Sequence, residues 1–499
     1  MTARRLPALA TPALVLVLVL VAFAPAAARG AAQITIVNTD GPNEGFNDPT
    51  AATPVGGNTG TTVGQQRLIA FERAAEIWGE LLDTPVEIRV RASFDPLPCT
   101  ADEGALGGAF PDTVVSDSPD APLPGAWYPS ALANKFAGTD LVPGSDDITA
   151  RFNSSVGQTG CLENGSWYYG LDAQHGTGFD LVAVLLHELG HGLGFLTLVD
   201  DSTGTEFLNQ PDIFESMIFD ESTGKHWTDM TAAERAVSDV NTGHVLWDGA
   251  AVHAQAPGVL GPMLVLTVDS PASIAGDLDF GTAAFGPDIS EVTVSGQLVQ
   301  AIDAADTVGP ATTDGCSAYS NASAVDGHIA LVDRGDCLFV EKAANAQTAG
   351  AIALVVVDNV PAAQPPGMAG DDPSITIPVI SVTQAAGATL KANLGAGVHV
   401  RIGVNPRRRA GTGSLGRLRL YAPNPAEPGS SISHWDTSAT PNLLMEPNLS
   451  GDLPHSVDLT LPLLRDIGWR SDSFPAPEER EAPGEAGGER ATREVTDRP

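Results

Sequence analysis

Basic side chains are scarce in this sequence. Its 499 residues include 61 acidic and 26 basic residues, only four of them lysine, and the formal net charge is −35. Nucleic acids and anionic membranes both bind proteins through basic surfaces. The charge balance therefore argues against either as a partner and indicates a well-solvated acidic surface.

Long apolar runs are also missing after the N-terminal region. The one clear run, residues 13–24, follows two arginines and is too short for a bilayer, which needs ~20 apolar residues. Small residues then offer cleavage sequences at 26–28 and 30–32, and this order is typical of a secretory signal peptide. Residues 1–32 are therefore predicted to be a signal peptide, and the mature protein is expected to be secreted, with no membrane segment.

Cysteine is rare, and no pair of cysteines has the spacing of a structural zinc site. The four are Cys99, Cys161, Cys316 and Cys337. An even number in an exported chain predicts two disulfides, with four buried free thiols as the alternative. Three pairings exist, and we favour Cys99–Cys161 with Cys316–Cys337 because each pair then lies within one predicted domain.

A metal-binding motif stands in LLHELGHGLGFLT, residues 185–197. His187 and His191 are four residues apart, so on a helix they share one face and can present ring nitrogens to one metal ion. Glu188 points roughly 100° away around the helix axis, toward the open coordination position of a catalytic zinc. The HExxH spacing therefore predicts a zinc site with Glu188 as general base.

The surrounding residues predict where this helix begins and ends. Asp180 is a good N-cap for the buried apolar sequence that follows it. Gly194 can end the helix in a left-handed turn that sends the chain back beneath the metal. Two histidines seldom hold a catalytic zinc, and the commonest extended motif has a histidine where this chain has Thr197. A third ligand must therefore come from elsewhere.

The first half of the chain has the pattern of an α+β domain. ITIVN is a candidate strand, and the three- and four-residue spacing of apolar residues predicts a helix over 65–82 with one buried face. Residues 86–94 alternate as a half-buried strand does, and 146–152 is a further strand. The stretch between 100 and 180 is otherwise rich in Gly, Pro, Asp and Ser and is expected to be loop-rich.

A different pattern begins near residue 260. Residues 327–359 follow the order strand, helix, strand, which implies two parallel strands, and their turn lacks the GxGxxG of a dinucleotide-binding site. Together with 269–287 and 375–390, this stretch resembles a protease-associated (PA) domain over roughly 260–404. The resemblance implies a module without catalytic residues of its own that binds substrate or gates access to a site.

Three residues are candidates for the third ligand. Glu215 would suit a thermolysin-like site, but it lacks the Asn-Glu context of that class, and Gly194 would then have no role. His226 is the histidine that follows the motif most closely, in a polar, turn-like stretch. His434 lies 243 residues after His191.

The blocks HELGHGLGF, SHWD, NLLMEP and LPLLRDIGW support His434, because together they resemble the leishmanolysin-like branch of the metzincin peptidases. An inserted PA domain accounts for the long separation. The resemblance implies that the zinc ligands are His187, His191 and His434. It also implies that Glu188 is the base, that Gly194 forms the glycine turn and that Met445 forms the methionine turn. The sequence does not identify a side chain that would help zinc to stabilise an oxyanion. The position after Met445, where a tyrosine could serve, is Glu446.

The sequence thus predicts an α+β, metzincin-like zinc peptidase domain interrupted by a β-rich α/β PA domain. A signal peptide is predicted at 1–32 and a disordered tail at 471–499. The catalytic domain is predicted in two pieces, 33–259 and 405–470, with the PA domain inserted between them at 260–404. The expected cofactor is one Zn²⁺, the expected partner is a protein or peptide substrate, and Ca²⁺ in the Asp-rich loops is left open. The alternative is a non-catalytic secreted peptide-binding protein on the same scaffold. Cleavage preference and oligomeric state are not predicted.

Overall fold

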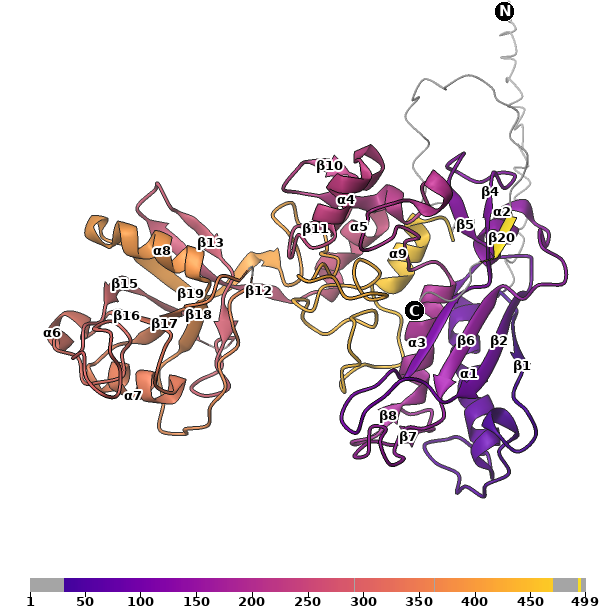
Figure 1. Ribbon diagram of the computed structural model, residues 1–499, viewed down its shortest axis with the longest axis horizontal. Helices are drawn as coiled ribbons and strands as arrows, with labels where there is room; N and C mark the ends of the chain where they lie inside the picture. Colours follow the sequence, from indigo (N-terminus) through magenta and orange to yellow (C-terminus); the bar gives the residue numbers. More distant parts are fainter. Residues whose placement is uncertain (1–30, 291, 363, 470–491, 495–499) are drawn as a thin grey trace, which may run out of the picture.

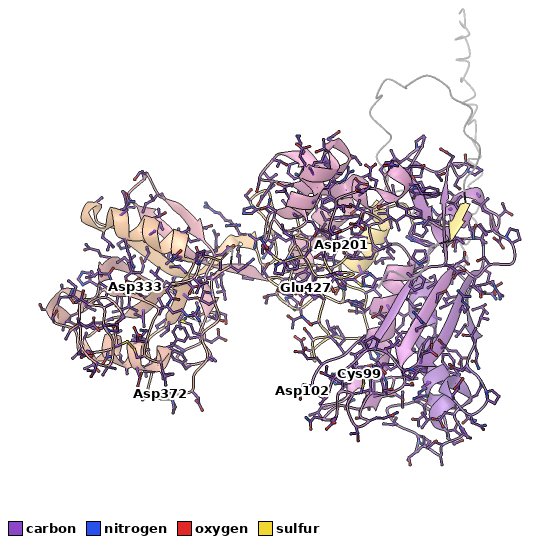
Figure 2. All side chains as sticks on the ribbon, in the orientation of Figure 1. Cys99, Asp102, Asp201, Asp333, Asp372 and Glu427 are labelled. Carbon is purple, nitrogen blue, oxygen red and sulfur yellow. A yellow bond between two sulfur atoms is a disulfide. The ribbon has the colours of Figure 1, made fainter. Side chains whose placement is uncertain are left out.

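The computed structural model describes residues 31–290, 292–362, 364–469 and 492–494. The chain forms two lobes that are joined by a pair of long strands (Figure 1). Figure 2 labels Cys99 and Asp102 in the first lobe and Asp333 and Asp372 in the second.

The first lobe is built around a four-stranded sheet in the order β1-β2-β6-β3. Strands β1 (Ile34–Asn38), β2 (Ile88–Asp95) and β6 (Ile148–Asn153) are parallel, and β3 (Gly107–Pro111) runs antiparallel to β6 at the sheet edge. Alternate residues of β2 are buried, as the sequence pattern predicts.

Two helices, α1 (Val63–Leu81) and α3 (Leu181–Gly192), pack together in this lobe. Apolar residues recur along α1 with helical spacing, so its buried face includes Phe71 and Trp78. The Trp78 indole N–H donates to the Leu186 carbonyl oxygen at 3.2 Å, which connects the two helices. This hydrogen bond and the core that the two helices share fix the position of α3.

Shorter elements complete the first lobe. In the N-terminal half they are η1 (Gly45–Asn47), β4 (Thr113–Ser116), β5 (Trp127–Pro129), α2 (Ser130–Ala137), β7 (Trp167–Tyr168) and β8 (Phe179–Asp180). After α3 they are η2 (Phe207–Asn209), η3 (Glu215–Met217), β9 (Ile218–Asp220), β10 (Lys225–His226), η4 (Trp227–Asp229), α4 (Ala232–Ser238), β11 (Val245–Trp247) and α5 (Ala250–Val259).

One hydrophobic core joins two distant parts of the chain in this lobe. Its buried residues come from 32–260 and again from 418–469, which contains α9 (Thr460–Asp466). The segment between them forms its own hydrophobic clusters. The second lobe is therefore inserted into the first.

The second lobe contains an eight-stranded sheet in the order β13-β12-β19-β15-β16-β17-β18-β14. Its central strands β15 to β18 are parallel, whereas β12 and β19 are antiparallel to each other. The strands are β12 (Pro262–Ser270), β13 (Gly276–Leu278), β14 (Gly281–Thr282), β15 (Val294–Gln300), β16 (Ile329–Asp333), β17 (Ala353–Val357), β18 (Val379–Val382) and β19 (His399–Arg409).

Helices cover both faces of this sheet. Leu331 and Val355 share a cluster with Leu390 of α8 (Gln384–Asn393), while their neighbours Ala330 and Leu354 share another with residues of α7 (Phe339–Thr348). Successive strand residues point to opposite faces, so the continuous apolar runs of β16 and β17 serve both layers. The short α6 (Ala322–Val325) and η5 (Leu394–Ala396) complete the lobe.

The two ends of the inserted segment lie next to each other. The Ala410 amide donates to the Gly261 carbonyl oxygen at 3.0 Å, and the Gly261 amide donates to the Thr440 carbonyl oxygen at 2.7 Å. The chain leaves and re-enters the first lobe at almost one point, as insertion of a whole domain requires.

The main sequence predictions of local structure are confirmed. The predicted helix over 65–82 is α1, the strands at 86–94 and 146–152 are β2 and β6, and the strand–helix–strand unit is β16, α7 and β17. Both favoured disulfides are present, Cys99–Cys161 and Cys316–Cys337.

Two predictions fall largely outside the described residues, namely the signal peptide and the disordered tail. Within the tail, Thr492–Glu494 form strand β20, antiparallel to β4, so for these three residues the structure differs from the prediction. An unpaired strand edge accepts such backbone pairing whatever the composition of the added segment. None of the helices in the described part of the chain combines the length and apolar character that a membrane span requires.

The signal peptide expected from the sequence has two candidate cleavage sites, and contacts at the start of the described chain favour one of them. Ala32 is buried, 6% exposed, and its amide donates to the Gly79 carbonyl oxygen at 2.8 Å. Cleavage after Ala32 would remove this contact, so we expect cleavage after Ala28 instead. Intact-mass and N-terminal peptide analysis of the exported protein would show this; a mature chain beginning at Gln33 would contradict it.

Candidate metal centre

Helix α3 presents the HExxH motif from a buried position. Its N-cap is Asp180, whose carboxylate accepts hydrogen bonds from the Val182 and Ala183 amides at 2.9 and 3.3 Å. A carboxylate at this place satisfies otherwise unpaired amides and suits the positive end of the helix dipole. The helix is therefore anchored at its start, two turns before His187.

The end of α3 is a glycine turn. Gly194 has a φ of +122°, a conformation that side-chain-bearing residues rarely adopt, and the Phe195 amide donates to the Gly190 carbonyl oxygen at 3.0 Å. A Cβ atom on Gly194 would lie 2.8 Å from the Ile467 side chain. Conformation and close packing both require glycine here, and the turn reverses the chain directly after His191.

Three histidine side chains converge on one point, although one is far away in the sequence. His187 Nε2 lies 3.1 Å from His191 Nε2 and 3.3 Å from His434 Nε2. Nitrogen ligands of a tetrahedral zinc, each at about 2.0–2.1 Å, are separated by about 3.3 Å. Among the described residues, these three form the one group of three or more His, Cys, Asp or Glu side chains placed to hold a metal ion.

Each of the three rings donates its other N–H to a backbone carbonyl oxygen. His187 Nδ1 is 2.7 Å from the Leu444 oxygen, and His191 Nδ1 is 2.7 Å from the Phe195 oxygen. His434 Nδ1 is 2.8 Å from the oxygen of Ser430. Because a carbonyl oxygen only accepts, each neutral ring carries its proton on Nδ1 and turns a free Nε2 lone pair toward the others.

The environment also keeps the histidines uncharged. Burial lowers the pKa of His187 to about 4 and that of His191 to about 3, and it holds the pKa of His434 well below its usual value. Neighbouring imidazoles lower the last two further. Three neutral imidazoles with convergent lone pairs are the ligand form that zinc binds, so the residues present fit this metal.

Glu188 follows His187 on α3, and its side chain contacts the edge of the sheet. Its Oε2 accepts a hydrogen bond from the Ala109 amide of β3 at 3.1 Å. Burial raises the pKa of the Glu188 carboxyl to about 7, and the Ala109 hydrogen bond partly opposes this shift. A cation held by the histidines would lower the pKa again by stabilising the carboxylate.

Met445 lies under the helix that carries the motif. Its side chain is fully buried, and a Cβ atom added to Gly190 would lie 2.9 Å from the Met445 sulfur. The Met445 carbonyl oxygen accepts from the Trp435 amide at 2.7 Å, directly after His434. The structure therefore brings the methionine segment, α3 and His434 together.

The other two candidate ligands lie in separate contacts. Glu215 is fully buried and lies 3.3 Å from the Arg235 guanidinium. His226 Nε2 lies 2.8 Å from the Asp248 carboxylate. Neither belongs to the group that could hold a metal.

Thr197, which stands where the commonest extended motif has a histidine, has a different role. Its hydroxyl donates to the Asp212 carboxylate at 2.8 Å, and its amide donates to the Ser433 hydroxyl at 3.4 Å. Asp212 also accepts from the Leu198 amide at 2.6 Å. The bond to Ser433 ties the segment after the glycine turn to the residue before His434, and the bonds to Asp212 hold that segment in place.

Several residues of the site could not be found from the sequence. Leu444, Ser430, Phe195 and Ala109 act through backbone groups, which carry no side-chain signature. Asp212 is a buried carboxylate in the sequence PDIFE, and only its position before a buried apolar segment distinguishes it from surface aspartates.

Comparison with protein families identifies residues 294–390 as a PA domain. This match lies inside the region for which the sequence predicts such a domain, so the presence of a PA domain is confirmed. The matched residues lie within the second lobe, and the histidine cluster lies outside them.

Three relatives illustrate the similarity among characterised proteins. ER degradation-enhancing alpha-mannosidase-like protein 3 of Homo sapiens is 33% identical over 139 residues, which are 26% of this chain and 14% of the relative. Signal peptide peptidase-like 3 of Arabidopsis thaliana is 37% identical over 112 residues, 22% of this chain and 20% of the relative. Vacuolar-sorting receptor 3 of the same plant is 33% identical over 153 residues, 28% of this chain and 24% of the relative. This chain thus spans less than a quarter of each of these relatives.

Solved structures also share a limited part of the chain. An aminopeptidase from Aneurinibacillus sp. strain AM-1 has a TM-score of 0.23 and 20% identity, covering 29% of this chain and 31% of that one. BSAP, a zinc aminopeptidase from Bacillus subtilis, has a TM-score of 0.21 and 20% identity, covering 31% and 36%. Because both TM-scores are far below 0.5, no fold or function is assigned to this chain from these structures.

The first test of the site separates His434 from His226. His434→Ala removes one of three convergent lone pairs, so we expect zinc affinity to fall by about two orders of magnitude or more, because a coordination bond is lost. His226→Ala should leave zinc affinity unchanged. Competition with a chromophoric chelator measures both, and equal affinities in the two variants would contradict the assignment.

Proposed function

We propose that this protein is a secreted zinc metallopeptidase whose metal ligands are His187, His191 and His434. The observation that carries the proposal is the convergence of three free Nε2 lone pairs, at 3.1 and 3.3 Å, two of them from the helix that also carries Glu188. Three protein ligands leave zinc an open position, which is the arrangement of a catalytic rather than a structural site.

Zinc, when bound, supplies Lewis-acid chemistry: it lowers the pKa of water to ≈ 7 and polarises a carbonyl group. The protein supplies the proton transfers. Glu188 takes the proton of the attacking water and passes it to the leaving amine, so it acts as general base and then as general acid. The Ala109 amide holds Glu188 Oε2 at 3.1 Å and so restricts the position of the carboxylate.

The finer assignment within this proposal is a metzincin-type site. Three features support it: the turn at Gly194 with its φ of +122°, the burial of Met445 beneath Gly190, and a third histidine on a segment that packs against the residues after the turn. Phe195 and Trp435 are in edge-to-face contact with ring centroids 4.9 Å apart, which fixes the returning chain against the His434 segment.

The PA domain is proposed to bind protein substrates or to gate their access. Its relatives include proteins named as a signal peptide peptidase, a mannosidase-like protein and a sorting receptor, so the module alone does not specify a reaction. The reaction is assigned from the histidine cluster. The PA domain is assigned an auxiliary role because the residues that flank the histidines belong to the core of the first lobe, whereas the PA domain has hydrophobic clusters of its own.

The proposed mechanism depends on one carboxylate. Glu188→Gln keeps the size of the side chain and removes its basicity, so zinc binding should persist while kcat on a casein-type substrate falls by at least ~100-fold. Metal content and turnover are measured on the same preparation, with and without 1,10-phenanthroline.

The wild-type protein is the control in this experiment. Turnover in Glu188→Gln equal to that of the wild type would refute the mechanism. Zinc bound by the wild type without any hydrolysis of proteins or peptides would instead favour the non-catalytic peptide-binding alternative.

The contact between the two ends of the inserted segment supports removing the PA domain at that place. Because Ala410 and Gly261 are hydrogen-bonded, replacing residues 263–408 with a short Gly/Ser linker should leave the first lobe folded. We expect unchanged zinc affinity, and a larger change in KM for a protein substrate than for a short peptide.

Thermal unfolding of this deletion variant serves as the control for its fold. Loss of zinc binding together with loss of the cooperative transition would show that the first lobe needs the PA domain to fold. Equal KM changes for the two substrates would exclude substrate binding or gating by the PA domain.

A further inference from the structure

Leu444 connects the histidine cluster to a carboxylate that has no part in the proposed chemistry. The Leu444 carbonyl oxygen accepts from His187 Nδ1 at 2.7 Å, and the Leu444 amide donates to Asp458 Oδ2 at 2.5 Å. The peptide groups on either side of Leu444 are therefore held by His187 at one end and by Asp458 at the other.

The second oxygen of Asp458 is bound to the start of α9. Asp458 Oδ1 accepts from the Thr460 amide at 3.1 Å and from the Thr460 hydroxyl at 3.0 Å. Thr460 is fully buried, and a Cβ atom added to Gly190 would lie 3.5 Å from its methyl group. Thr460 thus packs against the same helix that carries His187.

These contacts form a closed ring that begins and ends on α3. It passes from His187 to Leu444, then to Asp458 and Thr460, and returns to α3 at Gly190. Asp458 itself has a φ of +28°, in the left-handed region that residues other than glycine rarely adopt. Such a conformation persists where surrounding contacts determine it.

We infer that Asp458 is a positioning residue for the metal centre. It holds the Leu444 amide, and so aims the adjoining carbonyl oxygen at His187 Nδ1. That hydrogen bond keeps the His187 proton on Nδ1 and orients the Nε2 lone pair toward the other two histidines. The inference rests on the proposed metal site, and it assigns to Asp458 a share of the zinc affinity.

A matched carboxylate allows a merely structural role to be separated from this one. Asp466 lies on α9, is buried, and like Asp458 accepts three hydrogen bonds, from the Trp247 indole and from the Ala251 and Val252 amides. In the described part of the chain, the hydrogen-bond partners of the three histidines do not include any of these donors. Replacing Asp466 therefore reports the general cost of losing a buried, hydrogen-bonded carboxylate.

The experiment compares zinc affinity in the full-length wild type, Asp458→Ala, Asp458→Asn and Asp466→Ala. Residues that orient a metal ligand from outside the coordination sphere typically change metal affinity 10–100-fold, so we expect a fall of about that size in Asp458→Ala and none beyond about twofold in Asp466→Ala. Asp458→Asn retains one acceptor oxygen for the Leu444 amide and should lie between wild type and Asp458→Ala. The visible absorption spectrum of the cobalt-substituted protein should change in Asp458→Ala and stay unchanged in Asp466→Ala.

Thermal unfolding of the metal-free variants shows whether each is folded. If Asp458→Ala is not folded, Asp458→Asn takes its place in the comparison of zinc affinities. Zinc affinity in the Asp458 variants equal to wild type would overturn the inference, as would an equal fall in Asp466→Ala. A wild-type protein that binds no zinc would overturn the proposed function instead, so the two failures are distinguishable.

Discussion

The hydrogen bond from each histidine Nδ1 to a backbone carbonyl is the interaction on which the candidate centre depends. A neutral imidazole offers one lone pair, and these bonds decide that it is on Nε2. The three carbonyl oxygens belong to Phe195, Ser430 and Leu444, from three different segments. The fold must therefore position these backbone segments as accurately as the side chains. The methionine segment packs against α3, and the loop before His434 is hydrogen-bonded to the segment that follows the glycine turn.

Local features of this arrangement could be read from the sequence because they depend on neighbours along the chain. Asp180 begins α3, the HExxH spacing puts two histidines on one helix face, and Gly194 supplies the turn. The disulfides were also predictable, since each joins cysteines within one lobe. The alternation in 86–94 gave β2, and the PA domain followed from its strand–helix–strand order.

Features that depend on distant contacts could not be read in this way. The order of β1, β2, β6 and β3 places Ala109 against Glu188, and no pattern around Ala109 indicates this. The sequence pointed to His434 only through a family resemblance. His434, rather than Glu215 or His226, meets the other two histidines because residues 418–469 pack into the core of the first lobe. Asp458 resembles any loop aspartate until its contact with Leu444 is seen.

The insertion of the PA domain has a consequence for the order in which this protein is made. His187 and His434 are separated by 247 positions, and the whole second lobe lies between them along the chain. During synthesis the N-terminal ligands emerge first, and the third follows only after an independent lobe has had time to fold. A growing or truncated chain that stops before residue 434 carries the HExxH helix without the complete triad. The insertion thus delays convergence of the three histidines until the chain has been made as far as residue 434.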